Sequence, residues 1–216
     1  MALIGSALLA LVLPAAAPAK LTEVGVIGAT NPVTAASCPA SPCLAVSRTT
    51  GFQVKVATVH NPLAVPRDGT IVAWTITLGK PNATQIKYFN ANEGGEAEAA
   101  IAILRPQRKP NLTYKLIAQS PLLKLQPWFG MTAQFPLETT IQVKKGDQIA
   151  LTVPTWAPAL ALGFGNDTSW RASRPKKQCT STNAQTDHTQ LNSSVQYYCL
   201  YQTARLTYSA TLISTP

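Results

Sequence analysis

Apolar and polar residues alternate with a period of two in several short segments of this chain. Residues 52–56 (FQVKV) show the alternation in its simplest form, which is typical of a strand with one buried face. The segment 70–78 (TIVAWTITL) carries the alternation further and predicts a central strand with Trp74 as a core anchor. The buried face of this strand is expected to hold Val72, Trp74, Ile76 and Leu78.

Other strand-like runs follow along the chain. They comprise residues 84–89, 99–104, 112–120, 122–126, 159–164, 195–201 and 204–213. Residues 139–153 (TTIQVKKGDQIALTV) predict a hairpin, because Ile141 and Val143 share one face and Gly146-Asp147 permits a turn. Residues 165–194 are polar and predict a long loop.

About ten short strands separated by Gly, Pro, Asn and Asp turns, with no convincing helix, predict an all-β fold. The architecture we expect is a two-sheet antiparallel sandwich, jelly-roll-like, in a single domain over residues 45–216. Residues 93–104 contain Glu and Ala, which favour a helix. Their paired glycines and terminal Arg-Pro instead favour a turn followed by a strand.

The N-terminal region has a different character. Residues 1–19 combine an uncharged apolar run, Pro14 and the small-residue motif Ala17-Pro18-Ala19, which is the layout of a secretory signal peptide. The run of about 12 residues is shorter than the roughly 20 needed to span a bilayer, and no later segment is long and apolar enough, so no transmembrane segment is expected. Residues 20–44 predict a leader arm that ends in a ring closed by Cys38 and Cys43.

The four cysteines are expected to form disulfides, because an even count in an exported chain is typical of an oxidising compartment. Three connectivities are open, and we favour Cys38–Cys43 and Cys179–Cys199 because each pair is close in sequence and flanked by loop residues. A zinc site is the alternative, but neither pair has the two-residue spacing of a zinc knuckle. No cofactor is expected.

The chain carries CPASPC (38–43), PRDGTIVAWTITLG (66–79), AIAILRP (100–106) and IQVKKGDQIAL (141–151), in this order. This series resembles a group of secreted bacterial β-sandwich proteins that is common in actinobacteria. The resemblance covers about residues 38–153 and implies a jelly-roll-like fold. It implies no particular chemistry, because one fold hosts many functions.

The net charge of +9 predicts accumulation near polyanions such as acidic glycans or envelope polymers. Basic clusters occur at 105–109, 144–145 and 171–177, without the continuous track and interleaved aromatics of a nucleic-acid site, so no nucleic-acid partner is expected. Asp187 and His188 are neighbours that would point to opposite faces of a strand, which argues against a serine triad.

Candidate site residues fall into two groups. The segment 90–98 predicts a solvated turn, with calcium binding by Asn90, Asn92, Glu93 and Glu96 as a weaker alternative and catalysis by Glu96 or Glu98 as the weakest. Trp128, Trp156 and Trp170 stand in loop-like contexts, where an exposed indole can stack on a sugar, and Arg171 follows Trp170. Packing is the favoured role for each indole.

We therefore expect a secreted or cell-surface, non-catalytic β-sandwich module whose ligand class is carbohydrate or an anionic envelope polymer. Two alternatives stay open. One is a glycan-active enzyme that uses Glu96 or Glu98, and the other is a structural surface or assembly protein without a small ligand.

Overall fold

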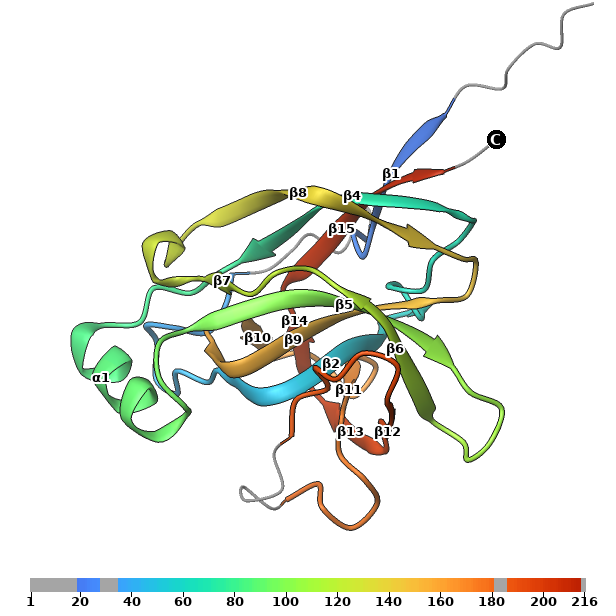
Figure 1. Ribbon diagram of the computed structural model, residues 1–216. Helices are drawn as coiled ribbons and strands as arrows, with labels where there is room; N and C mark the ends of the chain where they lie inside the picture. The colour runs from blue at the N-terminus through green and yellow to red at the C-terminus, as the bar shows by residue number, and fades with distance from the viewer. Residues whose placement is uncertain (1–18, 28–34, 181–185, 215–216) are drawn as a thin grey trace, which may run out of the picture.

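The computed structural model describes residues 19–27, 35–180 and 186–214, and the predicted signal peptide lies outside these ranges except for Ala19. Two antiparallel sheets pack on one another (Figure 1). The smaller sheet has the strand order β1-β15-β4-β8. Its strands are β1 (Lys20–Val24), β15 (Tyr208–Ser214), β4 (Gly69–Thr77) and β8 (Thr132–Val143).

The larger sheet has nine strands, with the central order β12-β6-β5-β9-β2-β11-β13, while β3 pairs with β2 and β7 with β5. Its strands are β2 (Val46–Val56), β3 (Val59–His60), β5 (Glu98–Pro106), β6 (Thr113–Gln119), β7 (Leu123–Lys124), β9 (Gln148–Ala157), β11 (Ser169–Ala172), β12 (Ser194–Gln196) and β13 (Cys199–Gln202). A separate ladder pairs β10 (Leu160–Leu162) with β14 (Ala204–Leu206).

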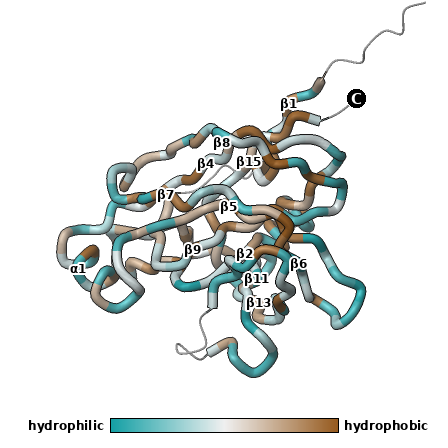
Figure 2. Tube along the Cα trace, viewed as in Figure 1, coloured by the Kyte–Doolittle hydropathy of each residue, from teal (hydrophilic) through white to brown (hydrophobic). Residues whose placement is uncertain are grey.

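The predicted all-β, jelly-roll-like sandwich is confirmed. Successive long strands change sheets along the chain: β2 and β5 lie in the large sheet, whereas β4, β8 and β15 lie in the small one. The apolar segments gather where the two layers face each other, and the loops at the sandwich ends are mostly hydrophilic (Figure 2). Tyr208 of β15 links the layers, because its hydroxyl lies 3.1 Å from the carbonyl oxygen of Ile149 in β9.

The segment 84–89, predicted as a strand, belongs instead to helix α1 (Ala83–Asn92). Asn82 caps the helix in a capping box: its side chain accepts from the Gln85 amide, and the Gln85 side chain accepts from the Asn82 amide. Ile86 and Phe89, three residues apart, pack against the core. This three-residue spacing places Ile86 and Phe89 on one face of a helix, and the predicted strand is wrong. The turn and strand predicted after it are confirmed by β5.

A register shift in β4 overturns one predicted core position. Ile71 is fully buried, whereas Val72 is only partly buried. The pairing of β4 with both β15 and β8 shifts between Ile71 and Ala73, and such a bulge reverses which side chains face the core. Trp74, Ile76 and Leu78 follow the bulge and are buried as predicted.

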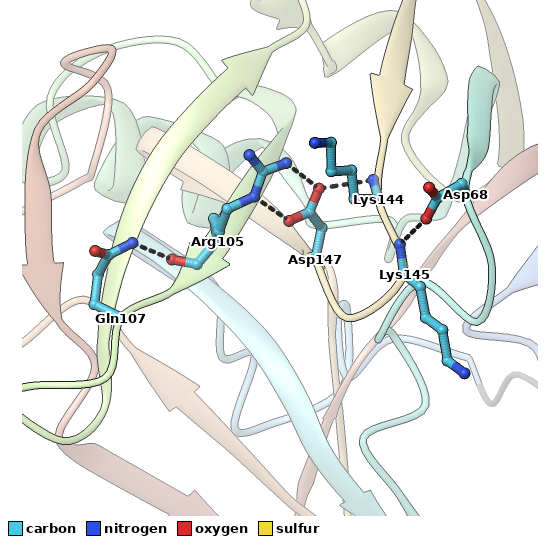
Figure 3. A network of polar contacts seen from close by, with 6 residues as sticks. All are labelled: Asp68, Arg105, Gln107, Lys144, Lys145 and Asp147. Carbon is cyan, nitrogen blue, oxygen red and sulfur yellow. Dashed lines mark hydrogen bonds and ion pairs between the residues drawn. The ribbon is translucent and has the colours of Figure 1, made fainter.

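The predicted hairpin over 139–153 is wrong, because β8 and β9 lie in different sheets and the turn between them carries the chain across the sandwich. Asp147 holds this turn (Figure 3). Its buried carboxylate accepts two hydrogen bonds of 2.8 Å from Arg105 of β5 and one of 2.9 Å from the Lys144 amide. The pKa of the Arg105 guanidinium is raised, mainly because the guanidinium donates these hydrogen bonds to Asp147.

Two further predictions need correction. Lys20–Val24, assigned to a leader arm, forms β1 and pairs with β15 along its whole length, so this part of the arm belongs to the sandwich. The long loop predicted over 165–194 contains β11, which lies between β2 and β13. β11 has only four residues and is fixed by its neighbours, so periodicity in its own sequence could not show it.

We expect Asp147→Ala to lower the free energy of unfolding by about 2–4 kcal/mol, since it removes a buried carboxylate with three charge-assisted hydrogen bonds. Urea unfolding of both proteins at pH 7 measures the difference. The matched control is Glu96→Ala, which breaks the exposed ion pair with Lys124 and should leave the midpoint nearly unchanged. Equal losses in the two variants would contradict the role assigned to Asp147.

Candidate functional site

Two of the three predicted ligand-binding indoles are buried, so they pack and do not offer a surface to a ligand. Trp156, at 0% exposure, stacks on Phe89 with the ring centroids 4.7 Å apart, and its Nε1 donates to Asn90 Oδ1 at 2.9 Å. Trp170, at 8% exposure, packs on Tyr201 at 4.8 Å. Trp128 is 39% exposed and ends the 3-10 helix η1 (Gln126–Trp128).

Arg171 also has a structural role in place of the predicted ligand contact. Its Nη1 donates to the carbonyl oxygens of Tyr197, at 3.2 Å, and Tyr198, at 2.6 Å. Burial lowers the pKa of this guanidinium. Arg171 therefore ties β11 to the segment between β12 and β13.

The predicted calcium ligands do not converge. Asn90 accepts from Trp156, Glu93 pairs with Arg48 at 3.1 Å, and Glu96 pairs with Lys124 at 2.8 Å. Within the described ranges, no group of three His, Cys, Asp or Glu side chains is placed to hold a metal ion. The segment is the end of α1 and the turn into β5, not the solvated hairpin tip that its Asn and Gly residues suggested. The hydrogen bond to Glu96, followed by the negative charges of Glu96 and Glu98, raises the pKa of the Lys124 ammonium.

Both predicted disulfides are formed, Cys38–Cys43 and Cys179–Cys199. The Cys38–Cys43 ring is fastened to the body of the domain on two sides. The Lys80 amide donates to the Cys38 carbonyl at 3.1 Å, and Gln85 Nε2 of α1 donates to the Pro39 carbonyl at 3.2 Å. Gly79 allows this approach, because a Cβ there would stand 2.9 Å from the Cys38 carbonyl oxygen. The ring is thereby held beside α1.

A groove of about 510 Å³ runs between α1 and the segment that leaves the ring. Its lining residues come from these two segments: Cys43, Leu44, Ala45, Ser47, Thr84, Gln85, Tyr88, Phe89 and Glu93. Tyr88 is 61% exposed, which makes its ring an accessible wall. Phe89 stacks on Trp156, so this indole, predicted as a ligand contact, packs behind the wall of the groove.

Polar groups surround the aromatic wall of this groove. Glu93 is held in place by Arg48, and the Gln85 side chain is fixed by the capping box and by Pro39. Ser47 and Thr84 add hydroxyl groups. None of the lining residues is Lys or Arg. Reasoning from the sequence missed Tyr88, because a strand was predicted where α1 lies; the signal was the Asn82-x-x-Gln85 capping pair.

A second hollow of about 410 Å³ lies on the small sheet and is lined mainly by Thr, Ser and Gln side chains. Its polar groups are largely engaged with each other. Thr77 and Thr132 are hydrogen-bonded at 2.9 Å, Gln134 donates to Thr211 at 3.3 Å, and Thr211 donates to Glu23. The α1 groove therefore offers more unengaged hydroxyl groups and the only strongly exposed aromatic ring among the residues that line either hollow.

His188 is buried inside the loop closed by Cys179–Cys199. Its Nδ1 lies 3.0 Å from the Tyr197 hydroxyl and its Nε2 lies 3.0 Å from Ser193 Oγ. Ser193 donates its own proton to the Gln190 carbonyl at 2.7 Å, so Nε2 donates to Ser193 and Nδ1 accepts from Tyr197. The contact between His188 and Ser193 therefore stabilises a turn. In a catalytic serine–histidine pair the serine hydroxyl donates its proton to the imidazole, which is the opposite direction.

No protein-family model, curated protein or solved structure matches this chain. The likeness to secreted bacterial β-sandwich proteins stays a prediction, and function has to be inferred from the geometry of the groove.

Burial lowers the pKa of His188 below the ordinary imidazole value. The unfolded chain then binds a proton more readily than the folded protein once the pH falls below about 6.5. We expect the free energy of unfolding to decrease from that pH downward until the folded imidazole is protonated, and to be insensitive to His188 above pH 7.5.

Urea unfolding between pH 7.5 and pH 4.5 measures this dependence. His188→Gln should flatten it, whereas His60→Gln, which changes the exposed histidine, should leave it intact. An unchanged slope in His188→Gln contradicts the assignment.

Proposed function

We propose that this protein is an exported, non-catalytic module that binds neutral carbohydrate in the groove between α1 and the Cys38–Cys43 ring. Two formed disulfides support export, because such bonds persist in oxidising compartments. In the part of the chain that the structure describes, no helix is long and apolar enough to cross a membrane.

The observation that carries the proposal is the exposed Tyr88 ring beside a row of hydrogen-bonding groups. The apolar face of a sugar stacks on an aromatic ring, while its hydroxyls need donors and acceptors at the ring edge. Ser47 and Thr84 supply hydroxyls and Glu93 supplies a carboxylate in the same groove. The volume of about 510 Å³ lies within the usual range for small-ligand sites.

Charge selects a neutral ligand for this groove. The Glu93 carboxylate is paired with Arg48 and no lining residue is basic, so the groove carries no excess charge that would attract a polyanion. The net charge of +9 belongs to the protein as a whole and attracts it to anionic envelope polymers. Salt weakens this attraction. The groove then provides selection among the neutral glycans that such a surface carries.

Tyr88→Ala is expected to weaken glycan binding about tenfold, since one aromatic stacking contact contributes about 1–1.5 kcal/mol. Binding of the wild-type protein is first mapped on a glycan array and then measured by calorimetry with the best glycan. The unfolding midpoint should hardly change, because Tyr88 is largely exposed.

Trp128→Ala is the matched control, because it removes an exposed aromatic ring that does not line the groove. It should bind as the wild type does. If Trp128→Ala loses binding while Tyr88→Ala keeps it, the groove is not the site; if no glycan binds the wild type, the proposed function itself fails.

A further inference from the structure

Four exposed basic residues gather at the end of the small sheet where the chain crosses between the layers. One row of paired residues across the four strands marks this end: Lys20, Ser214, Gly69 and Val143. Lys20 begins β1, and Arg67 stands two residues before β4. Lys144 and Lys145 directly follow β8. We call these four basic residues the basic edge; at the usual spacing of strands the row is about 15 Å wide.

Hydrogen bonds hold the segment that carries Arg67 beside the turn that carries the two lysines. The Val65 amide donates to the Asp147 carbonyl at 2.8 Å, and the Val65 carbonyl accepts from the Gly146 amide at 2.9 Å. Arg67 follows this contact by two residues, and the lysines directly precede Gly146. Three of the four cations therefore start from backbone segments that are bonded to one another.

The acidic side chains of this turn do not neutralise the basic edge through ion pairs. Asp147 accepts from the Lys144 amide at 2.9 Å, and Asp68 accepts from the Lys145 amide at 2.7 Å, so both carboxylates bind the backbone of the turn (Figure 3). Among the residues that the structure describes, no ion pair involves the basic edge. Its charges are therefore available to a ligand.

An open hollow of about 210 Å³ lies at the β1 side of the basic edge. Two basic residues and no acidic one line it: Lys20, Thr22, Pro66, Arg67, Leu212 and Ser214. The Ser214 hydroxyl donates to the Lys20 carbonyl at 3.3 Å, so Thr22 provides the hydroxyl that a ligand can use. Glu23 lies on the opposite face of β1, where it accepts from two hydroxyls of β15. The hollow therefore presents positive charge and suits an oxyanion.

Phosphate is the oxyanion that these side chains match. Lys binds phosphate oxygens as a compact point charge, and the guanidinium of Arg matches them with paired N–H groups. Since the cations are spread over a row of about 15 Å, they can engage several groups of one chain, which binds more tightly than separate ions do. No residue that lines the hollow is aromatic, so a nucleic-acid base finds no ring there on which to stack.

We propose that the basic edge binds a linear phosphate-bearing polymer, with one phosphate in the hollow between Lys20 and Arg67 and further phosphates along Lys144 and Lys145. The site gives a location to the attraction that the net charge provides. It shares no lining residue with the α1 groove and does not depend on the function proposed for that groove. Because β9 runs from the crossing turn to Trp156 behind α1, the two sites lie at opposite ends of this strand.

The test titrates the full chain with medium-chain sodium polyphosphate in a calorimeter at about 0.15 M salt, where the screening length is about 8 Å. Lys144→Gln/Lys145→Gln and Lys20→Gln/Arg67→Gln are each expected to weaken binding about 30-fold, since one basic residue near an anionic surface contributes a factor of about five. The slope of log affinity against log salt should fall by about two in each variant. The unfolding midpoints should hardly change, because all four side chains are exposed.

Lys176→Gln/Lys177→Gln is the matched control, because it removes the same charge from an exposed pair that follows β11 of the large sheet. It should weaken binding by no more than about twofold, since screening limits the effect of charges away from the polymer. Equal losses in the control and the edge variants mean that only the net charge attracts the polymer, and they overturn the proposal. An edge variant that binds as the wild type does overturns it as well.

Two other ligands test the class of polymer. Inorganic phosphate should not saturate the protein at concentrations at which polyphosphate does; equal affinity of the two contradicts a site for a linear chain. Oligothymidylate of equal charge should bind more weakly than polyphosphate, and tighter binding overturns the proposed ligand. Tyr88→Ala should bind polyphosphate as the wild type does, so failure of the groove and failure of the basic edge give different results.

Discussion

The hydrogen-bonded carboxylate of Asp147 holds the point where the chain crosses from the small sheet to the large one. The carboxylate accepts hydrogen bonds from Arg105 of β5 and from the Lys144 amide. The backbone carbonyl of Asp147 accepts a further one from the Val65 amide at 2.8 Å. Three segments distant in sequence therefore meet at one buried charge. Because β9 starts directly after Asp147, its register between β5 and β2 is fixed from this end.

At its other end, β9 positions the segments that line the groove. Trp156, near its last residue, donates to Asn90 and to the carbonyl of Gly95, and stacks on Phe89. The helix α1 and the turn after it are thus positioned by a strand of the large sheet, while the Cys38–Cys43 ring faces α1 from the other side. A groove between two restrained segments loses little entropy on binding, which favours a site built in this way.

The sequence predicted which segments are extended more reliably than how they connect. Alternation marks a strand with one apolar face, and the predicted apolar residues Tyr208, Ala210 and Leu212 of β15 are buried, although the Ser and Thr residues between them are buried as well. The bulge at Val72 and the crossing at Gly146-Asp147 depend on partner strands, which a single segment does not show. Helix α1 is only ten residues long, and the alternating residues Ile86 and Tyr88 within it also suited a strand. Burial of Trp156 and Trp170 likewise depends on neighbours distant in sequence.

In the function that we propose, the scarcity of acidic residues separates general attraction to a surface from recognition of a ligand. The chain has nine Asp and Glu residues against 18 Lys and Arg. Several of the acids are committed to structure: Asp147 holds the crossing, Asp68 accepts from the Lys145 amide, and Glu23 accepts from Ser209 and Thr211. The surplus positive charge acts over about a Debye length and carries no shape information. In this proposal, selectivity comes from an irregularity of the sandwich, the groove beside α1, where an exposed aromatic ring lies next to side-chain hydroxyl groups.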